Sequence, residues 1–201
     1  MEKRNETVLK LAQTALMAAL CFVSFTFLQI KIPMPGGAAT SFHVGNAFCV
    51  LAALILGGWY GGLAGAIGMG IADVMDPVYI TGAPKTFILK LCIGLIVGLV
   101  AHRIAKINES TDKKYVARWS TIAAIAGLGF NVIADPVVGY LYNQFILGQP
   151  QQVAGILAKW STATTFVNAI LSVVIASVLY NALRPVLLKT GMIRTRKVKT
   201  A

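Results

Sequence analysis

The sequence predicts an all-α membrane protein with six transmembrane helices, folded as a single domain over residues 1–201. Three observations support this fold class. The 201-residue chain is 57% hydrophobic and only 12% charged, whereas soluble domains carry about 25% charged residues. Glycines recur at helical spacing between two of its apolar segments, and six apolar runs nearly exhaust the chain. These runs cover residues 8–30, 42–56, 61–72, 86–101, 119–142 and 164–183.

Four of the six runs fit the length of a membrane span or come near it. Crossing the hydrocarbon takes about 20 residues, with a range of roughly 17–25. The runs 42–56 and 61–72 are shorter, so the sequence does not fix the ends of these two helices. The first run is too long for a signal peptide and lacks a small-residue cleavage site, so it is interpreted as span one.

The most informative stretch is 42–77, in which a glycine-rich reversal at 57–62 joins two short apolar segments. Its glycines at positions 57, 61 and 65 recur every four residues, as do those at 58 and 62. Because lipid supplies no hydrophobic drive for helix packing, membrane helices rely on small residues that let their backbones approach closely. The spacing therefore predicts a tightly packed helical pair in lipid.

The net charge of +11 is distributed as a topology signal, which argues against a nucleic-acid partner. With six spans, the N-terminal segment, the connection between spans four and five, and the C-terminal segment share one face. The positive-inside rule places that face, and hence both termini, in the cytoplasm. The three segments hold 14 of the 18 Lys and Arg residues, namely Lys3, Arg4, Lys10, Arg103, Lys106, Lys113, Lys114, Arg118, Arg184, Lys189, Arg194, Arg196, Lys197 and Lys199.

Three connections lie on the outer face. The first, 31–41, contains Pro33, Pro35, Gly36 and Gly37, which forbid a regular helix. It is longer than two antiparallel helices require, so both a plain connector and a gate over an outward pocket remain open. The second, 74–84, leads directly into span four. The third, 143–159, is polar and nearly uncharged, with room for a short interfacial helix.

Several features of the chain match a known family. Residues 15–19 read Ala-Leu-Met-Ala-Ala, an alanine-x-x-x-alanine element. The block from Gly45-Asn46 to Asp73 and the segment Gly82-Ala83-Pro84-Lys85-Thr86 followed by Lys90 are further matches. With its size and six-span layout, the chain resembles the substrate-binding S component of an energy-coupling factor (ECF) vitamin transporter, of the hydroxymethylpyrimidine/pyridoxine-type or riboflavin-type subgroup.

The resemblance implies the rest of a bacterial plasma-membrane importer. An S component binds its vitamin outside, docks on a transmembrane T component driven by two ATP-binding subunits, and topples to deliver the ligand. Ala15 and Ala19 share one face of span one, where small side chains permit close contact with that partner. The chain has no Walker A pattern, so it is not expected to be an enzyme or to hold a cofactor, and ATP is used by the partner subunits.

Polar side chains within the spans are the candidates for substrate binding, because burying them in a bilayer is costly. Three predicted spans direct such side chains to one level near the outer face, beneath the connection 31–41. On span five they share roughly one helical face, and on span six they recur every four residues. The candidates are Lys85 on span four, Asn131, Asp135 and Tyr142 on span five, and Trp160, Thr164 and Asn168 on span six.

An aromatic wall with amide and carboxylate groups suits a flat heterocycle, which needs stacking area and directional hydrogen bonds. Asn131, Asp135 and Asn168 are expected to bind the ring edge, and Trp160 to pack against the ring face. Structural interpretations stay open beside these. The asparagines can bond across helices, the carboxylate can pair with a nearby lysine, and the tryptophan can belong to an interfacial belt.

The carboxylate suits the protonatable nitrogen of pyridoxine or hydroxymethylpyrimidine, whereas two asparagines suit the flavin imide equally well. The interpretation adopted is the small-ring vitamin, with riboflavin as the alternative. A self-contained secondary transporter is a further alternative, although no clear internal repeat is present. An intramembrane enzyme at Asp73 and Asp76 lacks the carboxylate cluster that a metal-dependent site needs. No metal site is expected, because the cysteines and histidines lack ligand spacing.

Overall fold

The structure is a computed structural model that describes residues 2–34 and 37–193. Pro35 and Gly36 of the first outer connection, and the basic residues Arg194, Arg196, Lys197 and Lys199, lie outside the described residues. The main elements are α1 (Glu2–Phe27), β1 (Gln29–Pro33), β2 (Ala39–His43), α2 (Gly45–Leu56), α3 (Gly58–Met75), α4 (Ala83–Gly98), α5 (Lys113–Leu141) and α6 (Gln151–Lys189). The shorter helical segments are η2 (Ile80–Gly82), η3 (Leu99–Ile104) and η4 (Tyr142–Ile146).

A helix is present at each of the six predicted apolar runs. Among the described residues, four helical stretches are long and apolar enough to cross a membrane, namely Glu6–Phe27, Ile80–Ile104, Lys113–Ile146 and Gln151–Lys189. The other two are shorter: α2 has 12 residues and α3 has 18. The chain is thus a helical protein with at least four spans of sufficient length, and the count of six remains a prediction.

Glycine contacts pack α3 against its neighbours on two sides. A Cβ added to Gly61 would lie 2.2 Å from the Cα of Ala53 in α2. On the other side, a Cβ on Gly94 of α4 would lie 2.2 Å from the Cα of Gly62. The backbone between α2 and α3 turns at Gly57, which has a φ of 91° that side-chain-bearing residues rarely adopt. The glycine spacing thus permits the close helix approach that the sequence predicted.

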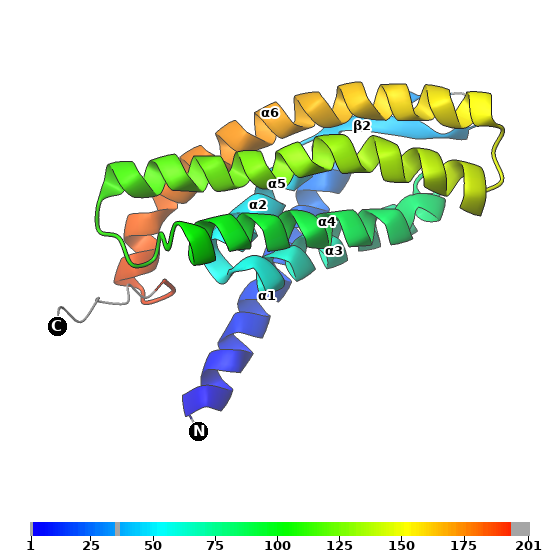
Figure 1. Cartoon of the computed structure of the whole chain (residues 1–201). Coiled ribbons are helices and arrows are strands. Elements are labelled where there is room, and N and C mark those ends of the chain that lie inside the picture. The colour runs from blue at the N-terminus through cyan, green and yellow to red at the C-terminus, as the bar shows by residue number, and fades with distance from the viewer. Residues whose placement is uncertain (1, 35–36, 194–201) are drawn as a thin grey trace.

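The all-α prediction is wrong for residues 29–43, which form an antiparallel β-hairpin. Strand β1 pairs with β2 in a register that sets Gln29 opposite His43 and Lys31 opposite Ser41. The two strand segments contain Ile30, Ile32, Thr40 and Phe42, residue types that favour strands. The hairpin lies alongside α6, and β2 runs behind this helix in Figure 1.

The outer connection expected at 143–159 is also much shorter in the structure. Helix α5 continues through η4 to Ile146, and α6 begins at Gln151, so only residues 147–150 connect them. Gly148 has a φ of 66°, which allows the chain to reverse over so few residues. Most of this polar segment is therefore helical, at the end of α5–η4 and the start of α6, instead of a loop.

Different segments of the chain meet at the two ends of the molecule. At one end, the start of α1, the turn at Gly57, His102 and residues 191–193 line a common cavity. The adjoining ends of β1 and β2 and the α5–α6 connection lie at the other end (Figure 1). Helix α2 lies at the centre with most of its side chains buried, while the outward faces of α5 and α6 expose large apolar residues, as a lipid-facing surface does.

Candidate functional site

A polar cavity of about 200 Å³ lies beneath the hairpin, between α3, α4, α5 and α6. The hairpin forms one wall through Met34, Ala38, Thr40 and Ser41. The cavity is at the end of the molecule that holds the α5–α6 connection, away from the start of α1. The polar residues predicted on three helices therefore do meet at one level under the segment proposed as a gate.

Six of the seven predicted substrate-binding residues line this cavity, and one does not. Trp160 is absent from the lining, and its side chain is 49% exposed. Only its backbone carbonyl takes part in the nearby polar network, where it accepts a hydrogen bond from Thr164. The structure therefore does not place the indole against a ligand in the cavity. The six that line it are Lys85, Asn131, Asp135, Tyr142, Thr164 and Asn168.

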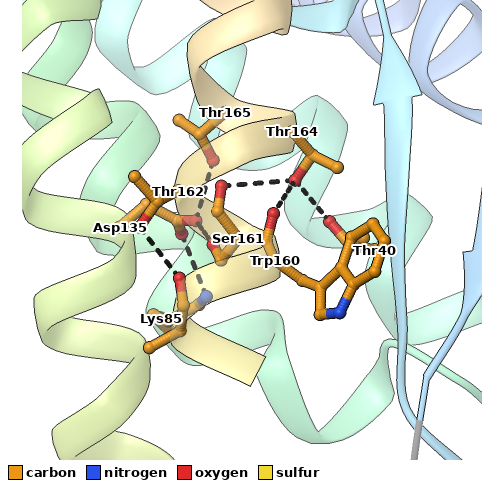
Figure 2. A network of polar contacts seen from close by, with 9 residues as sticks. Thr40, Lys85, Asp135, Trp160, Ser161, Thr162, Thr164 and Thr165 are labelled. Atoms are coloured by element: carbon orange, nitrogen blue, oxygen red, sulfur yellow. Dashed lines mark hydrogen bonds and ion pairs between the residues drawn. The ribbon is translucent and has the colours of Figure 1, made fainter. Parts of the chain in front are cut away.

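Asp135 is the centre of a network that joins three helices (Figure 2). Its Oδ1 lies 2.9 Å from Lys85 Nζ, across from α5 to the start of α4. Its Oδ2 accepts hydrogen bonds from two hydroxyls of α6, those of Ser161 and Thr165. The pairing with a nearby lysine that the sequence left open for Asp135 is thus present as the Lys85–Asp135 ion pair, and both residues line the cavity.

Both the oxygen and the nitrogen of the Asn168 side-chain amide form hydrogen bonds with the backbone of β2. Its Oδ1 accepts a hydrogen bond of 3.0 Å from the His43 backbone N–H, and its Nδ2 donates one of 2.9 Å to the Ser41 carbonyl. A hydroxyl contact of 2.7 Å between Thr40 and Thr164 adds a third link. These residues of α6 therefore fix the hairpin over the cavity, which is a different role from the ring-edge contact expected of Asn168.

The Tyr142 side chain also makes a hydrogen bond within the protein: its hydroxyl donates to the Thr81 carbonyl at 2.8 Å. This contact ties η4 to η2 at the cavity mouth. Tyr142 thus supports the rim of the cavity in this structure.

Four buried polar atoms on residues that line the cavity have no hydrogen-bond partner among the described residues. They are His43 Nδ1, Asn46 Oδ1, Tyr79 Oη and Asn131 Oδ1. A buried polar atom left unpaired costs roughly 1–3 kcal/mol, so a ligand that bonds to these atoms would recover that free energy. Asn131 was predicted from the sequence. His43 and Asn46 were not selected, although both are polar residues at the start of an apolar run.

The aromatic surface of the cavity comes from α1 and the α3–α4 connection. Phe25 contacts the His43 ring edge-to-face at a centroid distance of 4.7 Å, and the Tyr79 ring lies 6.0 Å from Phe25. All three side chains line the cavity. They provide the stacking area that the sequence analysis assigned to Trp160. No local pattern distinguishes Phe25 from the other apolar residues of its helix.

The outer strand of the hairpin has its own anchor, an ion pair between Lys31 and Asp76. The Lys31 ammonium also lies 5.3 Å from the centroid of the Tyr79 ring. Partial burial raises the pKa of Asp76, but hydrogen bonds from Lys31 and from the Val78 backbone N–H outweigh it and lower the pKa below its ordinary value of 3.8. The pair is therefore fully ionised at neutral pH.

Ala15 and Ala19, the predicted docking residues, are both exposed on α1. The opposite side of this helix packs on α3, where a Cβ on Gly68 would lie 2.2 Å from the Ala18 carbonyl oxygen. The two alanines thus belong to a face that is open in this chain. Their contact with a partner remains a prediction.

Comparison with known proteins gives one match. A family model described as "ECF-type riboflavin transporter, S component" matches residues 5–185, a range that contains every residue of the cavity. Searches of curated proteins and of solved structures gave no match.

Proposed function

We propose that this chain, which belongs to the family of ECF-type riboflavin transporter S components, captures its vitamin in the cavity beneath the hairpin. Members of this family are membrane-embedded substrate-binding subunits, so the chain is a vitamin-binding membrane protein and a transport subunit. In the proposed assembly, a T component and two ATPase subunits use ATP to complete the import. This chain then contributes no catalytic residue and no cofactor.

The observation that carries the proposal is a group of unpaired buried polar atoms that belong to residues lining one cavity. His43, Asn46 and Asn131 each carry such an atom, and all three residues line the cavity at the hairpin end. We place this end outside the cell and both termini in the cytoplasm of a bacterium, with residues 1–201 forming one six-span domain. The basic connection between α4 and α5 then faces the cytoplasm, as the positive-inside rule requires.

The size of the cavity favours a small ligand. Its volume of about 200 Å³ is below the roughly 300–1,000 Å³ of sites that enclose drug-sized ligands. A single-ring vitamin such as pyridoxine or hydroxymethylpyrimidine matches this volume, and the carboxylate of Asp135 suits its protonatable nitrogen. Phe25 and Tyr79 supply aromatic area for the ring.

Riboflavin is the second candidate, and the description of the matching family model favours it. A three-ring flavin with its sugar-alcohol chain needs more room than the cavity offers. The hairpin would have to move away from α6 to admit it, breaking the contacts that Asn168 and Thr40 make. We therefore expect riboflavin binding to displace the hairpin further than the binding of a one-ring vitamin does.

Two experiments test the proposal. Titration calorimetry on the purified chain with pyridoxine, hydroxymethylpyrimidine and riboflavin should show binding of one vitamin with high affinity. Uptake of that vitamin by cells should require the T component and the ATPase subunits. Failure of all three vitamins to bind would refute the vitamin assignment, and uptake by the reconstituted chain alone would show a secondary transporter instead.

A further inference from the structure

Lys90 places a buried cation in the wall of the cavity. Its side chain is 7% exposed and lines the cavity from α4. The ion pairs of the described residues join Lys31 to Asp76 and Lys85 to Asp135, so the Lys90 ammonium takes part in neither. The ammonium also makes no hydrogen bond within the described part of the chain. The hydrogen bond between Lys90 and Cys49 involves the Lys90 backbone carbonyl, which accepts from Cys49 Sγ.

The acidic groups around Lys90 are too distant or already engaged. Asp135 and Asp73 are the carboxylates whose charge reaches it, but no carboxylate oxygen of the described residues lies within 4.0 Å of its ammonium. Asp135 is already bonded to Lys85 and to two hydroxyls of α6. Asp73, itself 3% exposed, bonds to Thr86.

A buried ammonium without a close counter-charge is costly, because the effective desolvation penalty is several kcal/mol per ion. Ionisable side chains within membrane proteins that carry this cost mark binding sites and ion pathways. Lys90 lies in the wall of a cavity and not in a packed interface, so a bound molecule can supply the missing negative charge. The Asp135 carboxylate, on α5, lies in the same cavity, and its Oδ1 accepts a hydrogen bond only from Lys85, so it keeps acceptor capacity for a ligand cation.

We infer that Lys90 is a specificity-determining residue that selects a zwitterionic 3-hydroxypyridine. The ionised ring hydroxyl faces the Lys90 ammonium, and the protonated ring nitrogen faces Asp135. This inference rests on the proposed function and narrows it to pyridoxine. Hydroxymethylpyrimidine and riboflavin carry no ionised ring hydroxyl at neutral pH, so neither supplies the counter-charge that Lys90 lacks.

The test compares pyridoxine with 3-deoxypyridoxine, which lacks the ring hydroxyl and therefore cannot form the zwitterion, by titration calorimetry on the full chain. Wild-type protein should bind pyridoxine at least tenfold more tightly than the deoxy analogue. Lys90→Met should weaken pyridoxine ten- to a hundredfold while changing the affinity for the analogue less than threefold. Lys159→Met, which removes an exposed lysine of α6 outside the cavity, should leave both affinities unchanged.

Stability provides an independent readout. Because methionine removes a buried charge, ligand-free Lys90→Met should melt at the same temperature as wild type or higher. If this variant does not fold, Lys90→Gln and the wild-type preference between the two ligands provide the test.

Equal affinity of wild-type protein for pyridoxine and its deoxy analogue would overturn the inference, and so would a Lys90 variant that keeps the preference. Tighter binding of hydroxymethylpyrimidine or riboflavin than of pyridoxine would also overturn it, but would leave the vitamin-binding function intact. Absence of binding by all three vitamins would instead refute the proposed function.

Discussion

The side chain of Asn168 and the backbone of His43 are hydrogen-bonded across 3.0 Å, although 125 positions separate them in the chain. This bond joins α6 to the strand that roofs the cavity. The same asparagine donates to the Ser41 carbonyl on the same strand. One amide therefore holds the inner strand of the hairpin in place, as the ladder of a sheet would.

Asn168→Ala should release β2 from α6. Loss of both hydrogen bonds leaves a buried N–H and a buried carbonyl unpaired, each at a cost of roughly 1–3 kcal/mol. We expect a spin label at Ala38 to become more mobile, and vitamin to dissociate faster. Asn181→Ala is the matched control, because Asn181 lies on the same helix but bonds only to Ser177 of that helix. Equal label mobility in both variants would mean that Asn168 does not restrain the hairpin.

The anchor on the outer strand should respond to salt and acid. Lys31→Met removes the ion pair with Asp76 and should increase the mobility of the same label, more at low than at high ionic strength. The folded-state pKa of Asp76 is depressed, so its contribution is present above the ordinary value of 3.8 and is lost as pH falls through the lower folded value. In wild-type protein the label should therefore keep its mobility until pH falls below 3.8. A change near neutral pH would show that another group controls the hairpin.

Asp135→Asn tests the carboxylate of the cavity. A hydrogen bond to a charged group contributes about 1.5–3 kcal/mol, and about 1.4 kcal/mol is a tenfold change in affinity. Calorimetry should show pyridoxine binding weakened ten- to a hundredfold, and riboflavin binding affected less because the flavin is neutral. A thermal melt must first establish that the variant is folded.

The ion pair with Lys85 adds a control to this measurement. In the double variant Asp135→Asn with Lys85→Met, the unpaired lysine is removed, so thermal stability should recover relative to the single variant. Affinity for pyridoxine should stay low. Recovery of affinity together with stability would show that Asp135 serves only as the counter-charge of Lys85.

Ala15→Trp and Ala19→Trp test the open face of α1. A tryptophan there should prevent close docking of a partner helix, which abolishes uptake in cells while vitamin affinity of the purified chain changes less than twofold. Ala163→Trp places the same side chain on an exposed position of α6 and should preserve uptake. Parallel loss of binding and uptake in the α1 variants would indicate that this face is needed for folding.

Gly94→Ala tests the close contact between α3 and α4. The added Cβ would lie 2.2 Å from the Gly62 Cα, so the helices must separate, and overpacking of this kind typically costs about 1–3 kcal/mol. The melting temperature in detergent should fall. Gly129→Ala should not lower it, since a Cβ there meets nothing within 4 Å and alanine favours the helix. A stable Gly94→Ala protein would mean that the two helices tolerate wider spacing.

The sequence by itself determined the helices, the glycine contacts and the level of the polar residues. Each of these depends on local composition or on spacing along one helix. Gly61 and Gly65 are four residues apart on α3, as are Gly58 and Gly62, so their packing surfaces follow from the helix period. Asn131 and Asp135 are one turn apart on one apolar helix, so the same period sets them on one face.

Only the tertiary structure decided which of the polar atoms remain free for a ligand. Asn168 and Tyr142 looked equivalent to Asn131 in the sequence, but their partners, Ser41 and Thr81, come from distant segments. The hairpin that roofs the cavity forms because two segments either side of a proline-glycine tip pair with each other and with α6. Such contacts join residues that are far apart in the sequence, so the spacing along one helix does not predict them. The exclusion of Trp160 from the cavity lining and the presence of Phe25 in it are therefore visible only in the folded chain.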